Sequence, residues 1–197
     1  MTARFIRFVA LASLLALSAG CGDVAQTGRA PVTVVVQKLE VAQGATPDKL
    51  GGVLLSDVIT KGSTFNDVGK VTLSLLLKDP GGPGTVSSPS DLNAVTIDRY
   101  RVTYRRSDGR NTQGVDVPYT FDSALTFTIP ADGVVTAGFQ IVRHSAKEEA
   151  PLKALGFSGD IISTIAEVTF YGRDQVGNEV SASATVGIDF GDFADPA

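Results

Sequence analysis

The sequence of 197 residues contains no tryptophan, a single histidine, His144, and a single cysteine, Cys21. With one cysteine no disulfide can form within the chain, so the fold must be stabilised by its hydrophobic core. Zinc sites built from cysteine and histidine are excluded by count. A Ser-His-Asp arrangement would have to use His144, and the sequence has no Gly-x-Ser-x-Gly motif. We therefore expect no enzyme activity, no metal and no cofactor, although two carboxylates that meet in space could still serve glycoside hydrolysis.

The first twenty residues have the features of an export signal. Arg4 and Arg7 precede an apolar stretch from Phe8 to Leu17. This stretch is too short to cross a bilayer core of about 30 Å as a helix. Residues 1–20 are therefore interpreted as a cleaved signal peptide.

The segment that ends the apolar stretch, Leu17-Ser18-Ala19-Gly20-Cys21, resembles the lipobox of bacterial lipoproteins. The resemblance implies cleavage before Cys21 and diacylation of its sulfur, which would anchor the protein to a membrane of the cell envelope. Ser18 stands where the family usually has leucine. Ordinary cleavage near Ala19, which would give a secreted or periplasmic soluble protein, is the alternative.

Residues 21–31 are small, polar and without hydrophobic periodicity, and are expected to form a lipidated tether. The full chain has 17 Lys and Arg against 21 Asp and Glu, and removal of Arg4 and Arg7 with the signal changes the net charge from −4 to −6. This balance argues against nucleic acid as a partner. The acidic end, residues 189–195, is expected to be a frayed or solvated terminus rather than a metal site.

From residue 32 onwards apolar residues repeatedly alternate with polar ones, as in half-buried antiparallel strands. The predicted inward faces are Val71, Leu73, Leu75 and Leu77; Leu125, Phe127 and Ile129; Val135, Ala137, Phe139 and Ile141; Val168 and Phe170; and Val180, Ala182 and Val186. The segment 174–178, with its Gly177-Asn178 pair, predicts a hairpin turn that the Asp174 carboxylate caps. One helical turn is expected near Pro151 to Leu155.

Two segments resemble known sandwich families. Residues 97–109 are similar to the third strand and following turn of fibronectin type III domains, and residues 168–178 to the last hairpin of bacterial immunoglobulin-like domains. The absence of tryptophan and the greater length depart from these families, and extra strands near 32–41 and 53–60 would account for the length. We therefore expect one all-β domain over residues 32–197, an antiparallel immunoglobulin-like β-sandwich with extra N-terminal strands and at most one short helical turn.

Such a domain suggests a lipid-anchored structural or protein-interaction module of the cell envelope. The alternative is a small-ligand or glycan-binding lipoprotein whose site lies in the Gly- and Pro-rich loop 80–93. Arg99, Arg101 and Arg105 alternate on one strand face, with Arg106 just beyond. They form a candidate strip for an acidic envelope protein or polymer, unless they pair with neighbours such as Asp98, Asp108 or Asp116.

Overall fold

The computed structural model describes residues 28–79, 81–86 and 88–195. The strands are β1 (Val32–Ala42), β2 (Val53–Asp57), β3 (Asp67–Leu77), β4 (Gly81–Gly82), β5 (Thr85–Val86), β6 (Val95–Arg105), β7 (Phe121–Ile129), β8 (Val134–Val142), β9 (Ile162–Asp174) and β10 (Glu179–Gly191). Three short helical turns join them: η2 (Asp91–Asn93), α3 (His144–Lys147) and η3 (Leu152–Leu155). None of the helices in this part of the chain is long and apolar enough to cross a membrane.

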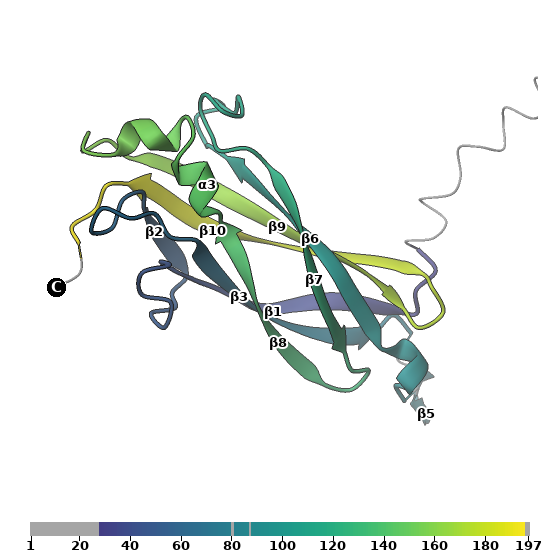
Figure 1. Ribbon diagram of the computed structural model, residues 1–197. Coiled ribbons are helices and arrows are strands. Elements are labelled where there is room, and N and C mark those ends of the chain that lie inside the picture. Colours follow the sequence, from purple (N-terminus) through teal and green to yellow (C-terminus); the bar gives the residue numbers. More distant parts are fainter. Residues whose placement is uncertain (1–27, 80, 87, 196–197) are drawn as a thin grey trace, which may run out of the picture.

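Two sheets pack face to face, so the predicted all-β sandwich is confirmed (Figure 1). The smaller sheet has the order β1-β3-β8, and the larger has the order β2-β10-β9-β6-β7. All neighbours in these two sheets run antiparallel except β2 and β10, which are parallel. The strands expected near 32–41 and 53–60 are present as β1 and the shorter β2.

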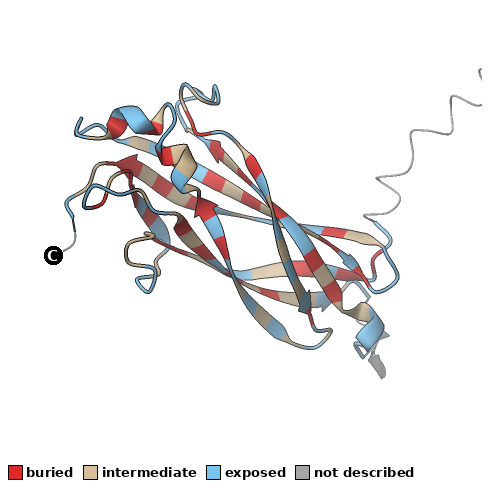
Figure 2. Cartoon of the chain, in the orientation of Figure 1, coloured by how far each residue is buried: buried red, intermediate tan, exposed pale blue. Residues whose placement is uncertain are grey.

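One cluster of apolar side chains fills the space between the sheets. Buried and exposed residues alternate along the strands, as Figure 2 shows. Val71, Leu73 and Phe170 are fully buried, and the predicted inward faces are confirmed. Tyr100 also lies in the core, where it packs edge-on against Phe139 at a ring distance of 5.1 Å.

The predicted hairpin joins β9 to β10 in register from Glu179 opposite Arg173. The Asp174 carboxylate caps the turn as expected, since its Oδ1 accepts hydrogen bonds from the backbone N–H groups of Val176 and Asn178 at 3.0 and 2.8 Å. Gly177 has φ +93°, a conformation that favours glycine. Burial raises the pKa of Asp174, but the hydrogen bonds from Asn178 and the turn amides outweigh it and leave this pKa below its ordinary value.

The helical turn expected near Pro151 is present as η3, and Gly156 follows it. The α3 turn lies just before it and ends after four residues. Its N-cap is Arg143, which makes no side-chain capping bond. The two turns cover one end of the sandwich, where Leu152 and Leu155 enter the core.

The acidic C-terminal segment is solvated in part but not frayed: Ala194 and Asp195 are exposed, residues 189–191 belong to β10, and residues 192–195 make hydrogen bonds to distant loops. Phe193 donates its backbone N–H to Asp57 Oδ1 at 3.1 Å. Asp192 and Asp195 accept backbone hydrogen bonds from Phe157 and Lys61, both at 2.7 Å. The segment therefore ties together loops that lie far apart in the sequence.

Candidate functional site

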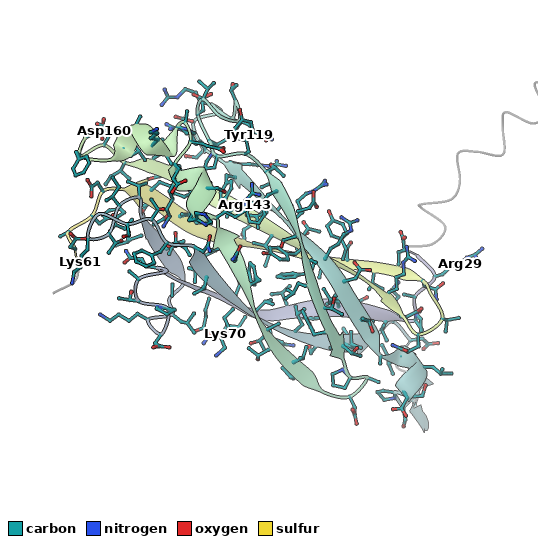
Figure 3. The ribbon with its side chains drawn as sticks, in the orientation of Figure 1. Arg29, Lys61, Lys70, Tyr119, Arg143 and Asp160 are labelled. Carbon is teal, nitrogen blue, oxygen red and sulfur yellow. The ribbon has the colours of Figure 1, made fainter. Side chains whose placement is uncertain are left out.

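The strand directions define two ends of the sandwich. The N-terminal end contains Gly28 to Pro31, the connection 78–94, and the turns 130–133 and 175–178. The far end contains the loops 43–52, 58–66 and 106–120, the helical segment 143–161 and the C-terminal residues 192–195. Figure 3 shows Arg29 at the first of these ends and Lys61 and Asp160 at the other. Cys21 and the residues expected to form the signal peptide and the tether before Gly28 lie outside the described residues.

The structure places Arg99, Arg101 and Arg105 on the exposed face of β6, as the alternation predicts. All three have acidic partners. Arg101 donates from Nε and Nη2 to both carboxylate oxygens of Asp122 at 2.9 to 3.2 Å, while Arg99 lies 3.6 Å from the same carboxylate. Arg105 lies 3.6 Å from Glu167. An anion bound on this strip would have to compete with these carboxylates.

The partners differ from those expected from the sequence. Asp122 lies opposite Arg101 on β7 and Glu167 lies on β9, whereas Asp98 sits at an irregularity in the register of β6. The hydrogen bonds from Arg101, followed by its charge and that of Arg99, hold the pKa of Asp122 below its ordinary value despite partial desolvation. The side chain of Tyr171 lies on the same outer face, and the Arg99 guanidinium carbon stacks over its ring at 3.9 Å from the ring centre.

Arg106 belongs to the loop after β6 rather than to the strip. Its guanidinium binds Asp108 at 2.6 Å, and Arg110 binds the same carboxylate at 3.1 Å. These bonds lower the pKa of Asp108, with the Arg106 bond the strongest contribution. Of the three acids considered from sequence, Asp108 is therefore the one that pairs with an arginine of the candidate set.

The loop 80–93, where the alternative ligand site was expected, is described at residues 81–86 and 88–93. It contains the small β4–β5 hairpin and η2, and it lies at the N-terminal end. The described hollows lie at the far end. Their volumes are about 280, 280 and 440 Å³, and they are lined by residues of loops 43–52 and 58–66 and of α3 and η3. Phe65 is the one aromatic side chain that lines them.

A buried ion pair organises this far end. Lys147 on α3 donates to Asp67 on β3 at 2.9 Å and to the backbone oxygen of Asp57 at 2.8 Å. Asp67 also accepts hydrogen bonds from Ser56 Oγ at 2.6 Å and from the Gly44 N–H at 2.9 Å. Burial raises the pKa of Asp67 above its ordinary value, although Lys147, Ser56 and Gly44 act in the opposite direction. The sequence analysis did not identify this cluster.

His144 lies at the start of α3, and its Nδ1 is 3.0 Å from Asn66 Oδ1. Asn66 also accepts the backbone N–H of His144 at 2.7 Å. The His144 side chain therefore forms a polar contact with the Asn66 side-chain amide, and this contact connects α3 to the loop before β3. Within the described ranges no group of three or more His, Cys, Asp or Glu residues is arranged to hold a metal ion.

No protein-family model and no curated protein matches the chain. A solved structure described as "X-ray structure of Northeast Structural Genomics Consortium target SoR45" is similar over 82% of this chain and 86% of its own, with 11% sequence identity and a TM-score of 0.38.

Proposed function

We propose that this chain is an exported, lipid-anchored module of the cell envelope that binds another protein through the far end of its sandwich. The distribution of exposed apolar side chains carries this proposal. Of the twelve large hydrophobic residues exposed in the described part of the chain, eight belong to the far end or the strand ends next to it. These eight are Val53, Leu55, Phe65, Val115, Tyr119, Phe157, Ile161 and Ile165.

Phe157 has the most exposed of these side chains, at 88%. Its backbone has φ +64°, which is an unfavourable conformation for a bulky residue. Its N–H is fixed by Asp192. Exposed aromatic residues held by their backbone are typical anchors of protein interfaces, because little side-chain freedom is lost on binding.

The proposed anchor supports the same arrangement. Residues 28–31 enter the sandwich at the end opposite α3 and the segment 143–161 that contains Phe157 (Figure 1). A flexible coil of about ten residues reaches roughly 15 to 20 Å. A lipid on Cys21 would therefore hold the N-terminal end near the membrane and present the far end to partners.

Site-specific photo-crosslinking in expressing cells tests this function. Benzoylphenylalanine replaces Phe157 or Tyr119 at the far end. It replaces Leu92 or Val176 at the N-terminal end as controls, whose exposure of 65 and 72% lies between those of Tyr119 and Phe157. We expect one shared protein adduct from both far-end positions and none from the controls. Adducts of equal yield at all four positions, or none at any, would contradict the proposal.

The anchor is tested separately by labelling with palmitate. Wild-type protein should incorporate the label and fractionate with membranes, whereas Cys21→Ser should do neither. Equal labelling of the two proteins would show that the lipid is not on Cys21.

A further inference from the structure

An apolar area on the outer face of the large sheet surrounds one carboxylate, Asp189. Along β10 the outward positions near the far end are Gly187, Asp189 and Gly191. The register places Val53 and Ile165 on either side of Gly187, and Leu55 and Ser163 on either side of Asp189. Val53, Leu55, Ile161 and Ile165 are 60, 49, 57 and 49% exposed. We call these four residues and Asp189 the Asp189 face.

The two glycines shape this face. A Cβ atom at Gly187 would lie 3.7 Å from Val53 Cγ1, and a Cβ at Gly191 would lie 3.2 Å from the Phe193 ring and 3.4 Å from Ile161 Cγ1. Neighbouring apolar side chains therefore cover β10 at both glycines. The side chains around Gly187 form one apolar patch and those around Gly191 form another. Asp189 lies between the two patches, about 7 Å along the strand from each, which is the distance of two residues.

The charge of Asp189 is unpaired in the part of the chain that the structure describes. Among the described residues no ion pair involves it, and its two cross-strand neighbours, Leu55 and Ser163, are neutral. Three other carboxylates of this sheet, Asp122, Glu167 and Glu179, differ from Asp189 because each of them binds an arginine. The charge of Asp189 is thus available to a cation from outside.

We propose that the Asp189 face binds an extended segment of a partner protein that carries a lysine or arginine between two apolar residues, in the pattern apolar-x-cation-x-apolar. In an extended chain these three side chains share one face and repeat at about 7 Å, which matches the spacing of the two apolar patches and Asp189. A second copy of this chain fits poorly, because a two-fold axis at the centre of the face would place Asp189 against Asp189. This inference rests on the proposed protein-binding function and names its surface and the chemistry of its partner.

Synthetic peptides test the inference on the full chain in detergent micelles. The probe Thr-Val-Thr-Lys-Thr-Val-Thr is titrated while backbone amide signals are followed by NMR, and Thr-Val-Thr-Glu-Thr-Val-Thr is the control peptide. We expect the lysine peptide to shift the amides of residues 53–55, 161–165 and 187–191 and to bind about ten-fold more tightly than the glutamate peptide. Asp189→Asn should abolish this preference. Asp132→Asn, the same change on an exposed turn at the N-terminal end, should preserve it.

Three outcomes would overturn the inference: equal binding of the two peptides, a preference that survives in Asp189→Asn, or amide shifts confined to other surfaces. The crosslinking from Phe157 and Tyr119 is independent of these results. A far-end adduct without peptide preference at Asp189 would retain the proposed function and reject this surface. Loss of both the far-end adduct and the peptide preference would reject the proposed function and this surface together.

Discussion

Lys147 Nζ lies 2.9 Å from both carboxylate oxygens of Asp67, and each of these side chains is 1% exposed. The pair joins α3 to β3, and through the backbone oxygen of Asp57 it also holds the end of β2. Removal of both charges from water is costly, so the pair is stable only because Ser56 and Gly44 satisfy the remaining acceptor sites of Asp67.

Lys147→Met should lower the free energy of unfolding by about 3 to 5 kcal/mol, because it leaves the Asp67 carboxylate buried and unpaired. The measurement is urea unfolding at pH 7. Lys153→Met, at an exposed position of η3, is the matched control and should change stability by less than about 0.5 kcal/mol. Similar values for the two variants would show that the pair is not a structural centre of the far end.

The same variant has a predictable pH dependence. Burial raises the pKa of Asp67 in the folded protein above the ordinary value of 3.8, and the loss of Lys147 removes a contribution that lowers it. The folded state then holds the proton more tightly than the unfolded state, so stability falls as the pH rises from 3.8 through the raised pKa. The destabilisation of Lys147→Met should therefore be smaller at pH 4 than at pH 7. A loss of stability in Lys147→Met that grows as the pH falls would contradict the raised pKa of Asp67.

Asp174 should behave in the opposite way. Its folded pKa lies below 3.8, so its contribution to stability is fully present above that value and is lost as the pH falls through the folded pKa. Asp174→Ala should cost about 1 to 3 kcal/mol at pH 7, because two turn amides lose their acceptor. The difference from wild type should shrink below pH 4 in urea unfolding. Asp132→Ala, in the turn before β8, provides the control.

The strand faces and the β9–β10 hairpin could be predicted because their signals are local. Alternation of apolar and polar residues fixes which side of a strand is buried, as at Val71 and Phe170. The turn at Asp174 uses bonds within four residues. Such patterns do not depend on which strands become neighbours.

The far-end site could not be predicted, because its contacts depend on topology. Lys147 and Asp67 are 80 residues apart, and a lysine in a helical turn ordinarily indicates a solvated surface. The Asp189 face depends on the parallel pairing of the five-residue β2 with β10, which places Val53 beside Gly187. For the arginine row the sequence predicted the exposed face, but the partners Asp122 and Glu167 follow from strand order alone.

The C-terminal segment should contribute to the stability of the far end. Asp57 accepts hydrogen bonds from Phe193 N–H and from Thr60 Oγ1, and Lys61 N–H donates to Asp195. Removal of residues 192–197 should lower the free energy of unfolding by about 1 to 3 kcal/mol, because Asp57 and neighbouring amides lose partners. It should also increase hydrogen exchange in residues 57–61. Unchanged hydrogen exchange in residues 57–61 would show that the C-terminal segment does not stabilise these loops.

The register of β9 gives the last prediction. Phe170 is fully buried between the sheets and packs edge-on against Phe139 at 5.4 Å, so Phe170→Ala should cost about 3 to 5 kcal/mol. The next residue, Tyr171, lies on the outer face under Arg99. Its replacement by alanine removes one exposed cation–π contact, and should cost about 0.5 to 1 kcal/mol. Thermal and urea unfolding of the two variants measure the difference directly. Because a shift of one residue exchanges the two faces of a strand, a larger loss for Tyr171→Ala than for Phe170→Ala would require the opposite register.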